Sequence, residues 1–346
     1  MRTLPKTEHL PYALYRAEQV REFDRIAIEE MGMPGATLMR RAGKALFDHA
    51  RSQFPDAERW TVVCGLGNNG GDGYVTAKLA HQVGLQVELL QMGDPNRIKG
   101  DALHHMHLAV EAGLEVKPFT APAKDTELIV DALLGTGLDR ELDGQWRGAV
   151  EMMNRHPAPV VAADIPSGLH ADSGAVMGVA VEAEATVTFI GLKQGLFTGE
   201  GPAYCGCVLF DGLEVPAGVF GGTLLSARRL DWERLGKQLL PRRRTAHKGS
   251  FGHVLIVGGA PGFSGAARLA GEGALRCGAG LVSIATHPEH AATINLGRPE
   301  LMCHAIDTVE ALTSLIERAN VVALGPGLGQ SAWGRELFAA VLGSGK

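Results

Sequence analysis

Three loops of this sequence carry polar side chains directly after apolar, strand-like runs. The first, GLGNNGGDG at 65–73, follows the run WTVVC at 60–64 and leads into a helical pattern. Its glycines allow backbone N–H groups to approach a pyrophosphate at the N-terminus of a helix. It also contains G-x-G-x-x-G, the pattern typical of dinucleotide sites. This loop therefore predicts a ligand that carries phosphate groups.

Carboxylates distinguish the other two loops. Asp131 lies within LIVDALL at 128–134 and precedes GTGLDRE at 135–141, while Asp164 follows PVVAA at 159–163 and begins DIPSG. A carboxylate in apolar surroundings is costly unless it is paired or binds a cation. Beside a phosphate-binding loop, Asp164 is a candidate general acid or base. The structural alternative is that each carboxylate caps its neighbouring turn.

Oxygen ligands for a cation come from all three loops, in Asn69, Asp131 and Ser167. A high-affinity divalent site usually carries more than one carboxylate, so a monovalent cation is the better prediction. His104, His105 and His107 resemble a metal cluster but cannot share one helical face. We expect them on a solvated helix surface.

The pattern of apolar residues predicts the strands and helices that must position these loops. Strand-like runs at 60–64, 86–92, 128–134, 159–163 and 185–190 alternate with helical patterns at about 72–83, 100–112 and 144–155. Alternation of β and α predicts a parallel sheet with helices on both faces. Ligands bind at the carboxyl ends of the strands in such a sheet, which is where the three loops lie.

A second β/α rhythm begins at 253–257, after a turn-rich stretch near 212–245 that predicts an inter-domain connection. It continues with a helix at about 266–276, a strand at 281–285, a helix at about 308–319 and a strand at 320–324. Three strands without a closing element predict an incomplete domain. Its glycine-rich loops at 258–265 and 325–329 again favour a nucleotide-type ligand.

Composition excludes several classes of protein. The chain has 346 residues, 45% hydrophobic, and a formal net charge of −5, which disfavours disorder and nucleic-acid binding. Its five cysteines are irregularly spaced and predict reduced thiols. The segment Met1–Pro11 has no apolar region of a leader peptide, and no unbroken apolar run is long enough for a membrane helix. We expect a cytoplasmic protein without membrane contact.

Two other functions remain open at this point. G-x-G-x-x-G alone would suit an NAD-dependent dehydrogenase, but the acidic residue expected about 20 positions later could only be Glu88, inside a strand. A non-catalytic nucleotide-binding protein is the second alternative. Ser167 is not in a G-x-S-x-G elbow, so it is not expected to be an esterase nucleophile.

Over residues 10–215 the chain resembles the NAD(P)HX epimerase family (the YjeF N-terminal domain). The resemblance rests on three motifs in this order: GNNGGDG, DALLGTG and DIPSG. From Lys248 onward the chain resembles the start of the ADP-dependent NAD(P)HX dehydratase, which has a ribokinase-like fold. The motifs that carry this resemblance are K-G-x-x-G, GGAPGFSGAA, RCGAGLV and GPGLG. The resemblance implies a Rossmann-like three-layer sandwich at 10–215, a linker at 216–244 and an incomplete ribokinase-like α/β domain at 245–346. The nucleotide-binding lysine loop and G-T-G-D segment of dehydratases lie beyond Lys346, so we expect no dehydratase catalysis from this part.

The same resemblance implies roles for particular residues. Asp164 would be catalytic, and Asn69, Asp131 and Ser167 would bind potassium. Ala266 and Gly327 would contact the dehydratase substrate, with ADP (or ATP) and Mg²⁺ as cofactors of that domain. The small-molecule substrate is NADHX or NADPHX, and we expect a homo-oligomer. The residues that would bind the substrate in the epimerase domain are Asn68, Asn69, Gly70, Gly71, Asp72, Gly135, Thr136, Gly137, Leu138, Asp139, Arg140, Glu141 and Asp164.

Overall fold

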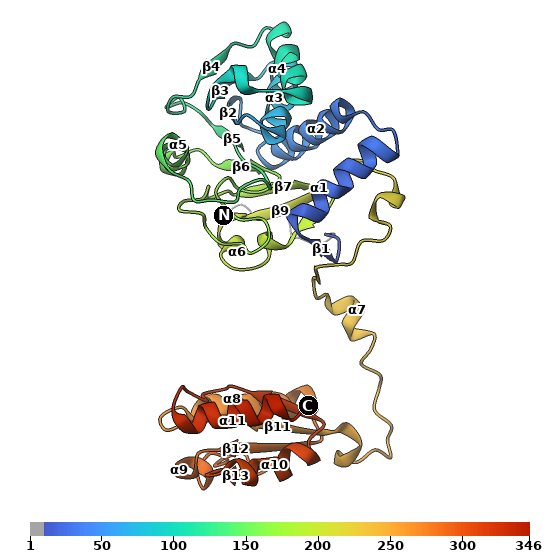
Figure 1. Cartoon of the computed structure of the whole chain (residues 1–346), viewed down its shortest axis with the longest axis vertical. Coiled ribbons are helices and arrows are strands. Elements are labelled where there is room, and N and C mark those ends of the chain that lie inside the picture. The colour runs from blue at the N-terminus through green and yellow to red at the C-terminus, as the bar shows by residue number, and fades with distance from the viewer. Residues whose placement is uncertain (1–9) are drawn as a thin grey trace. The chain divides into compact units, whose positions relative to one another are not determined.

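A computed structural model describes residues 10–346 and divides the chain into two compact units, one ending at Gly236 and one spanning Lys237–Lys346 (Figure 1). Most of the N-terminal segment used to argue against a leader peptide lies outside the described residues. Within residues 10–346, no helix combines the length and the apolar character needed to cross a bilayer.

A seven-stranded sheet forms the centre of the first unit, in the order β4-β3-β2-β5-β6-β7-β9. Every neighbouring pair in it is parallel. Four inner strands of this sheet, at 59–64, 128–132, 160–163 and 185–189, are almost entirely buried, which accounts for their nearly continuous apolar sequences. Their bounds are β2 Arg59–Cys64, β3 Gln86–Gln91, β4 Val116–Pro118, β5 Leu128–Ala132, β6 Val160–Ala163, β7 Ala185–Phe189 and β9 Cys207–Asp211.

Helices cover both faces of this sheet (Figure 1). On one face α2 (Gly35–Gln53), α3 (Asn68–Gln82) and α4 (Gly100–Glu111) share a core with alternate strand residues such as Val62 and Val130. On the other face α5 (Gly144–Arg155) packs against Val63 and Ile129. The result is the three-layer arrangement that the sequence predicted. The smaller helical elements are η2 Pro95–Arg97, η3 Gln194–Leu196, α6 Gly201–Tyr204 and η4 Ala217–Phe220.

The N-terminal helix α1 (Ala17–Arg25) continues into a π-helical turn, Ile26–Glu30. Before it, β1 (Ala13–Tyr15) joins a separate small sheet in which it pairs with β8 (Leu192–Lys193) and β10 (Ala227–Arg228). Residues at the start of the expected linker therefore fold with the first unit, followed by the short helix α7 (Trp232–Gly236). β8 and β10 have two residues each, which is too short for the alternation of apolar and polar residues that predicts a strand.

The strand order reverses between β2 and β5. From β2 the chain adds β3 and β4 on one side, and it then returns to add β5, β6, β7 and β9 on the other. Such a switch point leaves a crevice outside the carboxyl ends of the two central strands. The loops that begin at Gly65 and Leu133 follow these two strands directly.

The second unit is also a parallel α/β structure, with strand order β13-β12-β11-β14. The parallel α/β architecture predicted for both parts of the chain is thus confirmed. The expectation of three strands and no closing element was wrong, because β13 and α11 are also present. β13 is a partly exposed edge strand, LMCHA, so it lacks an apolar run. The bounds are η5 Lys248–Phe251, β11 His253–Val257, α8 Ser264–Cys277, β12 Leu281–Thr286, α9 Pro288–Ala291, β13 Leu301–Ala305, α10 Val309–Arg318, β14 Val321–Leu324 and α11 Ala332–Gly343.

Candidate active site

A pocket of about 390 Å³ lies at the switch point of the first unit. Its walls come from α1, α2, the start of α3, the loop after β5, the residue that follows β6 and strand β8. Four carboxylates and two cationic side chains line it, so the pocket is strongly polar on one part of its surface. These charged residues are Arg21, Asp24, Asp72, Asp101, Asp164 and Lys193.

Asp164 has an unusual backbone at the end of β6. Its φ is +64°, in the left-handed region, where Asp is less strained than most residues but still uncommon. Its N–H donates to Val187 O at 2.7 Å, and its Oδ1 accepts from Thr188 Oγ1 and Phe189 N, each at 3.3 Å. The surrounding structure therefore holds this carboxylate in one orientation at the pocket, as strained residues at functional sites often are.

Lys193 forms an ion pair with Asp164 through Nζ and Oδ1. Its side chain is only 1% exposed, and Nζ also donates to Phe189 O at 3.0 Å and Thr188 Oγ1 at 3.1 Å. All three ammonium protons thus have acceptors, which a buried lysine requires. The sequence reasoning missed Lys193, although GLKQG follows the strand at 185–190 and the strand-end rule could have found it.

Asp24 and Asp72 line the same pocket, and their carboxyl groups have no hydrogen bond or ion pair to any described residue. Burial raises the pKa of Asp24 to about 6; the negative charge of Asp164 adds to this effect and Lys193 opposes it. Burial also raises the pKa of Asp72 well above its usual value, and the charges of Asp164 and Asp24 raise it further. The pocket therefore places two carboxyl groups with raised pKa values beside an ion pair.

Asp24 was not predicted either. It lies four residues after Val20 and three before Ala27, both of them buried, so it projects from the packed side of the N-terminal helix. An acidic residue at an apolar position of a helix was the available signal.

The glycine-rich loop is helical earlier than predicted, because α3 begins at Asn68 rather than near 72. Close packing explains why glycine is needed there. A Cβ on Gly70 would lie 2.1 Å from Gly65 O, one on Gly71 would lie 2.3 Å from Met39 Sδ, and one on Gly73 would lie 2.6 Å from Cys64 Sγ. Tertiary packing thus overrides the low helix propensity of glycine. Of this segment, Asn68, Asn69 and Asp72 line the pocket, whereas Gly70 and Gly71 are buried against neighbours.

The loop after β5 forms the opposite wall. Gly135, Thr136, Gly137 and Leu138 line the pocket, and Arg21 Nη1 on α1 donates to Thr136 O at 3.0 Å. The last three predicted residues of this loop are exposed and lie outside the pocket lining; they are Asp139, Arg140 and Glu141.

The three predicted cation ligands lie around this loop. Ser167 Oγ donates to Asp131 Oδ1 at 2.6 Å and Ser167 N donates to Asp131 Oδ2 at 2.8 Å. Leu134 N donates to Ser167 Oγ at 2.9 Å, and the Asn69 side chain lies against Gly135. Burial raises the pKa of Asp131 to about 6, although its hydrogen bonds from Ser167 oppose the rise.

Asn69 gives independent support for a ligand at this position. It is 8% exposed, and neither Oδ1 nor Nδ2 has a hydrogen-bond partner. A buried amide without protein partners costs free energy unless a bound ligand satisfies it. One carboxylate with neutral oxygens suits a monovalent cation, and the described residues contain no group of three or more His, Cys, Asp or Glu able to hold a metal ion.

The histidine prediction needs correction at one position. His105 is 3% exposed, and its Nε2 lies 2.9 Å from Ala36 O in the contact between α4 and α2. It is therefore a buried packing residue and not part of a solvated surface. Its pKa is lowered, mainly by burial.

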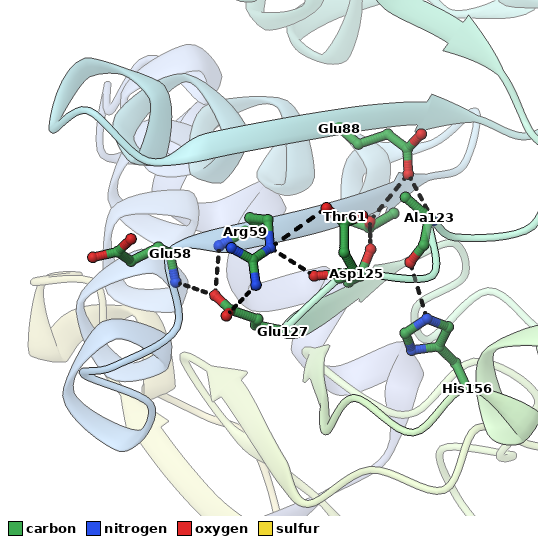
Figure 2. Close-up of polar contacts among 9 residues, drawn as sticks. Glu58, Arg59, Thr61, Glu88, Ala123, Asp125, Glu127 and His156 are labelled. Atoms are coloured by element: carbon green, nitrogen blue, oxygen red, sulfur yellow. Dashed lines mark hydrogen bonds and ion pairs between the residues drawn. The ribbon is translucent and has the colours of Figure 1, made fainter.

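Glu88 lies in a separate polar network near the amino ends of the strands (Figure 2). Its Oε2 accepts from Thr61 Oγ1 at 3.1 Å and from Ala123 N at 3.2 Å. Nearby, Arg59 Nη2 donates to Glu127 Oε1 at 2.5 Å. Since Glu88 is the third residue of its strand and does not line the pocket, it cannot serve as the ribose-binding acid that a dehydrogenase would need.

The second unit has its own switch point, between β11 and β14. Ala260 N donates to Gly327 O at 2.7 Å, which ties the two glycine-rich loops together. Gly327 has a φ of +65°, and its Cβ position would lie 3.2 Å from Ala266 Cβ at the start of α8. The two predicted contact residues of this unit are therefore neighbours.

Comparison with known proteins gives matches in both units. Residues 35–195 match the family of the YjeF-related protein N-terminus, and residues 254–345 match the NAD(P)H-hydrate dehydratase family. The chain is 44% identical to the bifunctional NAD(P)H-hydrate repair enzyme Nnr of Coxiella burnetii over 95% of this chain and 67% of that protein. It is 42% identical to the enzyme of the same name from Escherichia coli, over 96% of this chain and 64% of that protein.

One solved structure shows a similar fold. The crystal structure of yeast ynu0 has a TM-score of 0.53 and 20% sequence identity, and the match covers 60% of this chain and 91% of that one. At this identity the likeness concerns the fold.

Proposed function

The chain belongs to the family of bifunctional NAD(P)H-hydrate repair enzymes, and we propose that its first unit interconverts the R and S forms of NADHX and NADPHX. The observation that carries this proposal is the Asp164–Lys193 ion pair at a switch-point pocket large enough for a nicotinamide ring and its neighbouring ribose. The chain spans about two thirds of the length of these relatives.

The chemistry of the substrate suits these residues. NADHX carries a hydroxyl group on the ring carbon next to the ring nitrogen, so the nitrogen lone pair can expel it. Inverting that carbon needs proton transfer and no hydride acceptor. Asp164, fixed by Lys193 and by Phe189 N, is the catalytic group of this proposal.

Binding of the rest of the substrate falls to the two loops that line the pocket. We assign the nucleotide part to residues 68–72 at the start of α3 and 135–138 after β5, where a helix N-terminus and Arg21 favour negative charge. Residues 139–141 would reach the substrate only at the rim, because they are exposed.

Potassium fits the residues around Asn69. The unsatisfied Asn69 amide, together with Asp131 and Ser167, would hold the ion. Bound there, potassium supplies a fixed positive charge that keeps the loops after β2, β5 and β6 in register. The origin of the three ligands supports this role, because each of them lies at or after the end of a different strand of the sheet.

For the second unit we propose that it is the substrate-contacting part of the family's dehydratase, the ADP-dependent enzyme that converts S-NAD(P)HX to NAD(P)H. Ala266 and Gly327 would contact that substrate, and Mg²⁺ would accompany the nucleotide. Their adjacency at the β11/β14 switch point supports the assignment. Free thiols at Cys64, Cys205 and Cys277 suit a cytoplasmic location, and the homo-oligomer stays a prediction.

Replacement of Asp164 tests the epimerase proposal. With purified R-NADHX, Asp164→Asn should reduce the enzymatic conversion rate by at least about a hundredfold, as loss of an acid–base group does. The dissociation constant for the nucleotide should change much less. Saturable binding with no acceleration by the unmodified protein would favour the non-catalytic alternative, and turnover retained by Asp164→Asn would refute the role of Asp164.

A further inference from the structure

We infer that Asp24 on α1 is the general acid of this epimerase site and that Asp164 is its opposing base. The inference rests on the proposed epimerase function and assigns its two proton-transfer roles to two different carboxyl groups. It begins from the contacts of Asp164, all of which reach one of its two carboxylate oxygens.

Every hydrogen bond that Asp164 accepts on its side chain arrives at Oδ1, from Thr188 Oγ1, Phe189 N and Lys193 Nζ. An ammonium group beside a carboxylate stabilises its charged form. The remaining oxygen, Oδ2, is free of these contacts, and the side chain is 15% exposed at the pocket. Asp164 is thus arranged as a carboxylate that can accept a proton, and the proton for the departing hydroxyl must come from another group.

Asp24 is placed to supply it. The residue projects from the packed side of α1, where Val20 and Phe23 are buried, and its carboxyl group lines the pocket. No described residue hydrogen-bonds or pairs with this carboxyl. A carboxyl group withdrawn from water without a partner favours its neutral, proton-donating form.

Asp72, one of the other pocket carboxylates without a side-chain partner among the described residues, has a different environment. It is 8% exposed within the tightly packed first turns of α3. Burial raises its pKa well above the usual value, and the negative charges of Asp164 and Asp24 raise it further. Asp24, whose pKa lies at about 6, is better matched to losing and regaining a proton near neutral pH.

The reaction step balances with these two groups. The Asp24 carboxyl gives its proton to the hydroxyl oxygen; the C–O bond breaks as the ring nitrogen lone pair forms a C=N⁺ bond, and water leaves. A water molecule then adds to the same carbon from the opposite face, and Asp164 takes one of its protons. The hydroxyl group now has the inverted configuration, with Asp24 ionised and Asp164 protonated. Exchange of protons with solvent restores the starting state, and the reverse reaction uses the two groups in exchanged roles.

The pH profile gives a readout that a structural role would not move. The unmodified protein should show kcat/KM decreasing as pH rises above about 6, because the acid must be protonated. Other charged groups line the same pocket as Asp24 and remain in the variant, so loss of this limb would report on Asp24 itself. They are Arg21, Asp72, Asp101, Asp164 and Lys193.

The test compares Asp24→Asn, Asp24→Glu and the control Asp48→Asn, which removes an exposed carboxylate from α2. We expect Asp24→Asn to lower kcat for R-NADHX conversion by about 10²–10⁴-fold and to lose the limb near pH 6. Asp24→Glu should restore part of the rate together with the limb, and Asp48→Asn should match the unmodified protein.

Two outcomes separate the inference from the proposed function. If Asp164→Asn is inactive but Asp24→Asn keeps its rate within about threefold and its pH limb, the epimerase function stands and the role of Asp24 is refuted. If the unmodified, folded protein does not accelerate the conversion, the proposed function itself fails. A low rate in both Asp24→Asn and Asp24→Glu with an unchanged pH limb would also overturn the acid role.

Discussion

Replacing Lys193 with methionine removes the ammonium group that pairs with Asp164 while keeping an unbranched apolar stem. Breaking one side of a buried ion pair costs about 3–5 kcal/mol, because the other charge loses its compensation. Lys193 is 1% exposed and Asp164 is 15% exposed, so the carboxylate can recover some hydration from the pocket. We therefore expect Lys193→Met to lower the free energy of unfolding of the first unit by about 2–4 kcal/mol.

Asp164→Asn should also lower the free energy of unfolding, because it leaves the ammonium group of Lys193 buried among neutral acceptors. The double variant removes both charges and should cost at least about 2 kcal/mol less than the sum of the two single changes.

Urea unfolding followed by tryptophan fluorescence would measure this cycle. Trp60 lies in β2 of the first unit and is 1% exposed, so it reports on that unit when the other tryptophans are removed by Trp146→Phe, Trp232→Phe and Trp333→Phe. Additive single costs, within about 0.5 kcal/mol, would show that the two side chains do not depend on each other and would refute the ion-pair reasoning.

Three further outcomes follow from the same site. Gly70→Ala should lower the free energy of unfolding of the first unit by at least about 2 kcal/mol in urea, because its Cβ would lie 2.1 Å from Gly65 O. The control Gly67→Ala has open space around its Cβ position, so its free energy of unfolding should be almost unchanged. Potassium chloride should raise the Tm above its value in sodium chloride, and Asn69→Ala should abolish the difference; an unchanged difference would exclude Asn69 as a ligand. The folded-state pKa of Asp24 is raised from 3.8 to about 6, so ionising this carboxyl group as the pH rises through that range destabilises the folded protein. Asp24→Asn removes this destabilisation. The variant should be more stable than the unmodified protein by on the order of 2 kcal/mol at pH 8 and by nearly nothing at pH 3. Equal gains at both pH values would contradict that linkage.

Most of the main sheet could be predicted from sequence because its central strands are buried on both faces. Runs such as WTVVC at 60–64 are continuous and bounded by glycine, so their type and position were clear. Three of the four edge strands in the two large sheets were not predicted: β4 has three residues, VKP, and β9 and β13 are partly exposed. The fourth, β14, was predicted at 320–324. Edge strands lack the two-sided burial that makes the pattern visible.

The site was predicted in outline because polar residues at strand ends converge in any doubly wound sheet. Asp164, Asp131 and the residues around Asn69 are all found at one end of the sheet. Lys193 and Asp24 were missed because they come from β8 and α1, elements outside the main alternation. Their approach depends on how those elements pack against the sheet, which one-dimensional patterns do not specify.

Glycine in the loop at 65–73 shows a second limit of sequence reasoning. The pattern predicts close approach of phosphate, but Gly70, Gly71 and Gly73 are needed because neighbouring atoms leave no room for a Cβ. Both requirements select glycine, and spacing alone does not separate them.

The interconversion rate of purified R- and S-NADHX, followed by chromatography in potassium and in sodium buffer, tests the epimerase assignment of the switch-point pocket. The uncatalysed epimers interconvert slowly, so the rate and not the product identifies the activity. We predict a large acceleration by the folded protein in potassium and a weaker one in sodium. The same rate with and without the protein, in both buffers, would contradict the assignment.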